Sequence, residues 1–134
     1  MVTVICVGKK HESMYEQAIA HFEGRIKPYT KLKFVILPHS SLDNLDARAE
    51  ESTRILSRIS TDDYVVLLDE AGTNLPTPEL AQKIELAQNS SKNSTFIIGG
   101  AYGVDDSVHS RANIVVAFGK AVFPHQLMRV ILLE

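Results

Sequence analysis

The chain has 134 residues, a formal net charge of −2 and 45% hydrophobic residues. This composition is typical of one globular domain and excludes a disordered tail, a collagen and a coiled coil. No apolar run reaches the roughly 18 residues of a membrane span, and the chain start does not resemble a signal peptide, so we expect a cytoplasmic protein. The single cysteine, Cys6, lies in an apolar run; we expect it in the core, without a redox role.

The charges are distributed unevenly. Residues 1 to 33 carry six Lys or Arg against three Glu, whereas residues 43 to 106 carry twelve acids against five bases. The last 28 residues turn positive again. If the two chain ends meet in space, a mildly acidic protein would present one basic face; otherwise the charges are scattered and solvated.

Short apolar runs alternate with amphipathic stretches along the chain. The predicted strands, in order, are Thr3 to Val7, Leu32 to Leu37, Tyr64 to Leu68, Ser94 to Ile98 and Ile114 to Ala117. The strand interiors are apolar without alternation, which is typical of a parallel sheet that helices cover on both faces. The sequence therefore predicts a single α/β domain.

The stretches between the strands predict helices. The first follows Ser13, the expected N-cap, and its apolar face runs from Tyr15 to Ile26. A short helix is expected around Asp105 to Ser110 and a final apolar one from His125 onward. Neighbouring acids such as Glu50 and Glu51 are interpreted as charge on a helix surface. The second and third helices show the apolar stripes Leu45, Ala49, Ser52, Leu56, Ile59 and Leu80, Ile84, Ala87.

Ligands of an open parallel sheet bind at the carboxyl ends of its strands, so the residues that follow each strand are candidates for chemistry. Three glycines lie within Gly99 to Gly103, more than one left-handed turn requires, although a purely structural turn stays open. The other segments that follow strands are Gly8 to Lys10, Pro38 to His39, Asp69 to Gly72 and Phe118 to His125.

Common nucleotide and metal signatures do not match. The dinucleotide fingerprint fails because Ala101 stands where its second glycine belongs, and no phosphate loop occurs. A phosphoacceptor role for Asp69 is disfavoured because the first strand ends in Lys9 and Lys10, which would repel magnesium. The histidines lack metal-ligand spacing, so we expect no metal.

Two motifs at a fixed spacing resemble the SPOUT-class methyltransferases of ribosomal RNA. The first is Ile97 to Gly103, and the second, about twenty residues later, is Phe123 to Glu134, which begins Phe-Pro-His-Gln-Leu-Met-Arg. Within that class the chain closely resembles the large-subunit pseudouridine methyltransferase H family. Val4 to Lys10 and Ala18 to Tyr29 fit it too, so the resemblance covers nearly every residue.

The resemblance implies a parallel α/β sheet whose C-terminal segment forms a trefoil knot that binds S-adenosylmethionine. It further implies methylation of N3 of a pseudouridine in 23S ribosomal RNA of the assembled ribosome by a homodimer, with no DNA or membrane partner. Backbone amides and apolar walls at the implied cofactor positions suit adenine and a thioether better than phosphate. Those positions are Leu68, Gly99, Phe118, Gly119, Lys120, Ala121, Val122 and Phe123.

The implied chemistry requires mainly alignment, because a sulfonium methyl is already a strong electrophile and N3 must lose a proton. His125 could accept this proton or position the RNA, and positioning is the favoured role. Arg129, one helical turn later, could bind phosphate or a developing anion, or could be a structural residue that pairs with an acid inside the dimer. Lys120 is a weaker candidate for the anion contact.

In members of the family the chain continues beyond the position of Glu134 with more helix and a short tail. We therefore expect residues 1 to 134 to form the SPOUT methyltransferase domain without the C-terminal tail of the family. A noncatalytic module that binds the cofactor or the ribosome stays open as an alternative function. Methyl transfer to ribosomes that lack the modification discriminates between the two.

Overall fold

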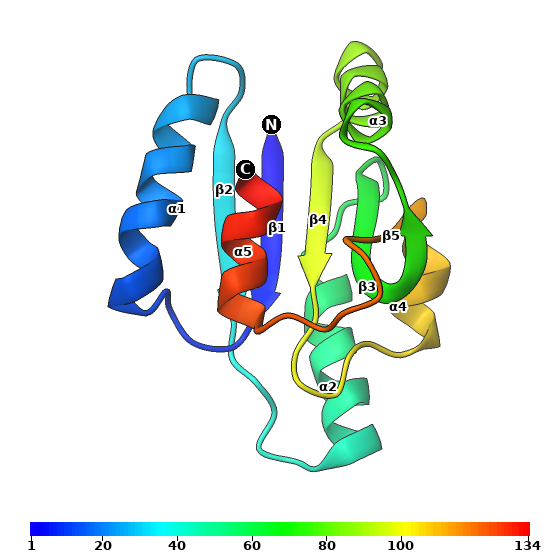
Figure 1. Cartoon of the computed structure of the whole chain (residues 1–134). Helices are drawn as coiled ribbons and strands as arrows, with labels where there is room; N and C mark the ends of the chain where they lie inside the picture. Colours follow the sequence, from blue (N-terminus) through cyan, green and yellow to red (C-terminus); the bar gives the residue numbers. More distant parts are fainter.

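The fold is built on a sheet of five parallel strands, shown in Figure 1, in a computed structural model that describes residues 1–134. The strand order is β2-β1-β4-β3-β5, and every paired strand runs parallel to its neighbour. The predicted α/β sheet is confirmed. The strands are β1 (Val2–Val7), β2 (Leu32–Leu37), β3 (Tyr64–Asn74), β4 (Ser94–Ile98) and β5 (Ile114–Ala117).

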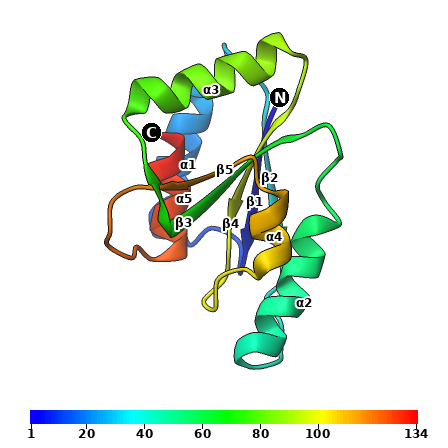
Figure 2. The same cartoon turned by 90° about the vertical axis from the view of Figure 1, so that its right-hand side faces the viewer.

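Helices cover both faces of the sheet, as its apolar strands predict. Figures 1 and 2 show α1 (Ser13–Ile26), α3 (Thr77–Asn89) and α5 (His125–Leu133) on one face, with α2 (Asn44–Leu56) and α4 (Asp106–Arg111) on the other. Parallel strands need such crossovers, because each connection must return the chain to the same edge of the sheet. The carboxyl ends of the strands consequently share one edge.

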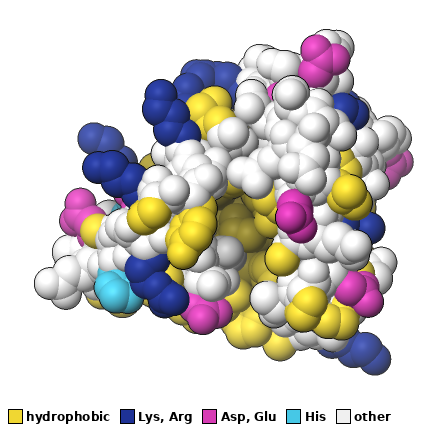
Figure 3. All heavy atoms as spheres, turned by 90° about the horizontal axis from the view of Figure 1, so that it is seen from above, with side chains coloured by type: hydrophobic (Ala, Val, Ile, Leu, Met, Phe, Trp, Pro, Cys, Tyr) yellow, Lys and Arg dark blue, Asp and Glu magenta, His cyan; other side chains and the backbone are white.

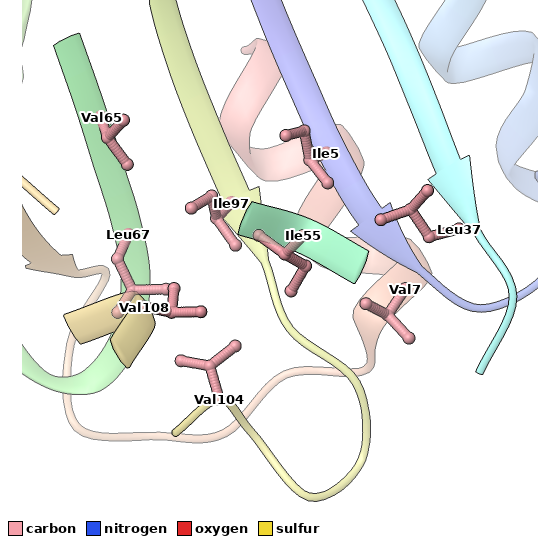
Figure 4. Packing of buried hydrophobic residues seen from close by; sticks show 9 residues of the cluster. All are labelled: Ile5, Val7, Leu37, Ile55, Val65, Leu67, Ile97, Val104 and Val108. Atoms are coloured by element: carbon pink, nitrogen blue, oxygen red, sulfur yellow. The ribbon is translucent and has the colours of Figure 1, made fainter. Parts of the chain in front are cut away.

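Two hydrophobic clusters fill the space between sheet and helices. Figure 4 shows the cluster beneath α2 and α4, where Ile5 and Val7 of β1 meet Ile55 of α2 and Val108 of α4. The next residues along β1, Val4 and Cys6, belong to the cluster on the opposite face, as the period of two in a strand requires. Cys6 is fully buried, which confirms its expected place in the core.

The third strand is longer than predicted. The segment Asp69 to Gly72 does not follow β3 as a loop but lies within it, and the pairing with β5 shifts register between Leu68 and Thr73. A Cβ on Gly72 would lie 2.8 Å from the backbone of Val115 and Val116. Glycine is therefore required where the second half of β3 crosses β5.

Two helix predictions need correction. Helix α1 begins at Ser13 itself, with Glu12 at the N-cap position and no side-chain cap. In α2 the predicted apolar stripe is right at Ser52, which is buried, and at Leu56 and Ile59, which pack against the core, but Leu45 is 69% exposed and the helix ends before Ile59. The buried residues of α2 are Ala47, Glu51, Ser52 and Ile55.

Helix α5 packs against α1 on one face of the sheet (Figure 1), and Figure 2 shows the C-terminus in this helix layer, apart from the N-terminus in the sheet. The basic residues of the first 33 divide between two ends of the molecule, since Lys9 and Lys10 follow β1 whereas Lys31 and Lys33 lie at the start of β2. No helix is long and apolar enough to span a membrane.

Candidate cofactor site

A cavity of about 440 Å³ lies at the carboxyl ends of β3, β4 and β5. This volume is within the range of pockets that hold a small organic ligand. Thirteen of its 22 lining residues are hydrophobic, so its walls suit an apolar ring system more than a phosphate. The cavity opens at the sheet edge where the topology predicts a ligand.

The structure brings nearly all the predicted cofactor residues to this cavity. Leu68 of β3 and Gly99 after β4 line it together with the segment that follows β5. Lys120 is the exception, because it is exposed and outside the lining. The lining residues of that segment are Phe118, Gly119, Ala121, Val122 and Phe123.

The turn Gly99 to Gly103 forms one wall of the cavity, and its first two glycines leave little space for a side chain. It closes on itself through a hydrogen bond of 3.0 Å from the Gly103 amide to the Gly100 carbonyl. A Cβ on Gly99 would lie 3.1 Å from Val104, and one on Gly100 would lie 2.6 Å from Glu51 Oε1. The glycines therefore allow a close approach between this turn and the residues behind it.

Helix α2 holds that turn through three polar side chains, Arg48 and, one helical turn later, Glu51 and Ser52. Arg48 Nε donates to the Tyr102 carbonyl at 2.8 Å, and the Asp105 amide donates to Ser52 Oγ at 2.9 Å. Between them Glu51 lies against Gly100. This role was not predicted, because Glu51 was interpreted as surface charge, Ser52 as part of an apolar stripe, and Arg48 was given no role. The spacing of Glu51 and Ser52 at three and four residues from Arg48, on one side of the helix, is the signal that could have indicated it.

Glu51 is buried, which corrects its interpretation as surface charge. Its side chain is 3% exposed; Oε2 accepts a hydrogen bond of 2.8 Å from the Ser40 amide, and Oε1 has no partner. A buried carboxylate oxygen without a donor is costly and is usually found where function requires it. Its neighbour Glu50 is a surface charge, as expected, and forms an ion pair with Arg54 on the same helix.

His125, the first residue of α5, also lines the cavity and is half-buried. Burial of its ring lowers the pKa of His125, the positive charge of Arg129 lowers it further, and Glu51 opposes both. The imidazole is therefore neutral over a wider pH range than that of a free histidine. A neutral imidazole can accept a proton.

Arg129 lies beneath the surface, which differs from the expected contact with RNA. It is 1% exposed, and its NH1 donates to the Lys9 carbonyl at 3.0 Å and lies 3.1 Å from His11 Nδ1. Its Nε has no partner, and no carboxylate forms an ion pair with it. In this arrangement Arg129 ties the segment after β1 to α5 and places a buried positive charge near His125.

Asp69 and His109 face each other across another part of the cavity lining. His109 Nε2 lies 3.8 Å from Asp69 Oδ2, and both residues are partly exposed. No group of three His, Cys, Asp or Glu residues could hold a metal ion. The cavity thus combines apolar walls, backbone polar groups and a few ionisable side chains.

A family model described as "Predicted SPOUT methyltransferase" matches residues 1–134 of the chain. The chain belongs to the SPOUT methyltransferase family. As a member of this family it uses S-adenosylmethionine. The resemblance that the glycine turn and the Phe-Pro-His-Gln motif indicate is thereby confirmed.

Relatives of this SPOUT methyltransferase match over almost their whole length. Three proteins named Ribosomal RNA large subunit methyltransferase H, from Streptococcus suis, Natranaerobius thermophilus and Clostridium novyi, are 36%, 38% and 38% identical to it. The alignments cover 99%, 98% and 99% of this chain and 89%, 87% and 89% of the three relatives.

The residues present fit S-adenosylmethionine on structural grounds. The adenine and ribose need apolar walls and backbone hydrogen-bond partners, which the turn at Gly99 and the segment 118–123 supply. The glycine turn is also a place where added side chains would collide with their neighbours. The bound cofactor would supply an electrophilic methyl group, and the protein would align it.

Proposed function

We propose that this SPOUT methyltransferase methylates N3 of a pseudouridine in 23S ribosomal RNA of the assembled ribosome. The observation that carries the proposal is the match over nearly the full length to relatives named for ribosomal RNA methylation. The cavity supports it, because the segments implied to hold the cofactor line one space at the carboxyl edge. The cytoplasm, where ribosomes work, is the compartment that this function requires.

In the proposed reaction the protein contributes mainly alignment and help with one proton. Leu68, Gly99 and the other residues of the segment 118–123 would hold the cofactor, and Lys120, which is exposed and does not line the cavity, would act on the approaching RNA. His125 borders the same cavity and is mostly neutral near pH 7, so it can either accept the N3 proton or orient the base by a hydrogen bond. Arg129 would act through His125 and the segment after β1.

We further propose that the protein acts as a homodimer and that its C-terminal segment forms a trefoil knot. Helix α5 supports the dimer, because its apolar residues other than Leu133 are only half-buried in one chain. A helix that is apolar nearly all round needs a second surface against which to pack. The partner chain would cover this surface.

The test is methyl transfer from labelled S-adenosylmethionine to ribosomes from a strain that lacks the modification. We expect label in 23S ribosomal RNA with the wild-type protein and none with a Gly99→Val variant that no longer binds the cofactor. Cofactor binding without transfer to ribosomes would contradict the proposal and favour the alternative, a noncatalytic binding module.

A further inference from the structure

A strip of exposed basic residues runs from the end of α1 to the start of β2. Between residues 25 and 33 the chain has four Lys or Arg and no acid, although its net charge is −2. Tyr29, in the middle of the strip, is 85% exposed. We call this surface the basic strip; its members are Arg25, Lys27, Tyr29, Lys31 and Lys33, all of them exposed.

The basic strip is separate from the cofactor cavity. The Lys31 carbonyl accepts a hydrogen bond of 2.8 Å from the Val2 amide, which fixes the strip at the edge where β1 and β2 begin. The cavity lies at the opposite edge, and a strand of six residues spans roughly 20 Å. Figure 3 looks down on the end with the strip and shows Lys and Arg side chains along its left side, over α1 and β2.

No cation of the basic strip forms an ion pair within the chain. The ion pairs of the structure are Arg54 with Glu50 and His109 with Asp69, and Glu134, which lines a groove with Arg25 and Tyr29, pairs with neither. Arg25 lies in the last turn of α1, where the helix dipole stabilises a cation. Lys27 is the C-cap residue of the same helix, but the helix dipole does not account for Lys31 and Lys33, which follow it in the chain.

We propose that the basic strip binds phosphates of the ribosomal RNA at a place remote from the methylated nucleotide. Exposed lysines and an arginine without partners attract a polyanion and gain affinity by releasing its counterions. The exposed ring of Tyr29 adds a face on which a base or sugar can stack. This inference rests on the proposed function, since it assumes that the substrate is a large folded RNA.

The separation of the two sites has a consequence for the substrate. A single nucleotide in the cavity cannot reach a surface roughly 20 Å away, whereas a folded RNA can contact both ends of the molecule. The basic strip thus favours the assembled ribosome over a short RNA that contains only the target nucleotide.

The test compares two charge-reversed proteins with equal net charge. The strip variant carries Lys27→Glu and Lys31→Glu, and the control carries Arg58→Glu, after α2, and Lys83→Glu, in α3, neither of which belongs to the basic strip. Ribosome binding is measured between 50 and 200 mM salt, with calorimetry of S-adenosylmethionine as a check on the fold. We expect the strip variant to bind at least tenfold more weakly than the control at low salt, with unchanged cofactor affinity. We also expect the slope of log affinity against log salt to become shallower by about 1.5, the value for two lost phosphate contacts.

Equal ribosome affinities of the strip variant and the control would overturn the proposal. A loss of affinity without a change of salt slope would also overturn it, because the contact would then not be with phosphate. Methyl transfer by the wild-type protein tests the proposed function separately. If the wild type binds ribosomes without methylating them, only the proposed function fails; if it does not bind them, both fail.

Discussion

His125 is the residue whose protonation state most directly affects the proposed reaction. Burial and the charge of Arg129 lower its pKa below the usual value near 6.5. If the neutral ring accepts the N3 proton, kcat/KM will fall only at pH values below about 6.5, because the ring is protonated only there. His125→Gln should then abolish this acidic limb and reduce kcat by about 10² to 10⁴.

The pH profile of His125→Gln also distinguishes the two roles of this residue. If His125 only positions the RNA, its substitution by Gln should raise KM and leave the shape of the pH profile of kcat unchanged. An acidic limb that persists in the variant would therefore show that another group accepts the proton.

Glu51 is the buried charge that opposes the lowering of the His125 pKa. Glu51→Gln keeps the shape of the side chain and an acceptor for the Ser40 amide but removes the negative charge. We expect a further decrease in the His125 pKa in this variant, measured by NMR titration of the imidazole, with the other histidines as internal references. Glu50→Gln, on the adjacent exposed side chain, is the matched control and should leave the titration unchanged.

The same NMR titration can contradict the role of Glu51. If His125 titrates identically in Glu51→Gln and in the wild type, the carboxylate has only a structural role behind Gly100.

Gly99 tests whether the glycine turn holds the cofactor. In Gly99→Val the new Cβ would lie only 3.1 Å from Cγ1 of Val104 and 3.4 Å from the backbone of Gly103. The two methyl groups of valine need still more space. The turn must shift, and the affinity for S-adenosylmethionine measured by calorimetry should fall at least tenfold. Gly99→Ala should have a smaller effect; full affinity in the valine variant would mean that the cofactor is not bound at this turn.

Helix α5 has an apolar surface that the single chain does not bury. Met128 and Leu132 pack against the core of the sheet, whereas Ile131 does not belong to that packing and is half-exposed. Ile131→Lys should therefore dissociate the proposed dimer with little loss of folding. Sedimentation at micromolar concentration should show a dimer for the wild type and a monomer for the variant. A wild-type protein that sediments as a monomer would show that α5 serves one chain only.

The elements were predictable from the sequence where burial alone determines the pattern. The apolar runs of β1, β2, β4 and β5 lie within a residue of their predicted bounds, because a parallel strand buried on both faces admits few polar residues. Helix α2 was misjudged at Glu51, which is buried and accepts a hydrogen bond from the loop backbone at Ser40, because a hydrophobicity pattern does not detect such a contact. The extension of β3 beyond Leu68 depends on its tertiary pairing with β5.

The segments that form the candidate site were predictable from the sequence, but the contacts of Arg129 were not. The segments that follow β4 and β5 were identified by their place after strands and by the family resemblance, and both line the cavity. The burial of Arg129 was not predictable, because its partners are the Lys9 carbonyl and His11, more than a hundred residues earlier in the chain. Sequence spacing predicts neighbours on one helix but not contacts between elements.

At the scale of the whole molecule, the two edges of the sheet have different properties. The carboxyl edge holds the cavity with His125 and the glycine turn, and the opposite edge holds the basic strip. A large RNA that contacts both edges would be oriented on the enzyme before its target base enters the cavity, which reduces the entropic cost of alignment.

Mass-spectrometric mapping of 23S ribosomal RNA after reaction with the wild-type protein tests the proposed activity most directly. Ribosomes lacking the modification are incubated with S-adenosylmethionine, and the RNA is digested to locate any added methyl group. The proposed function predicts one added methyl group, at N3 of a pseudouridine. A methyl group on another nucleotide, or unmodified RNA from a protein that binds the cofactor, would contradict it.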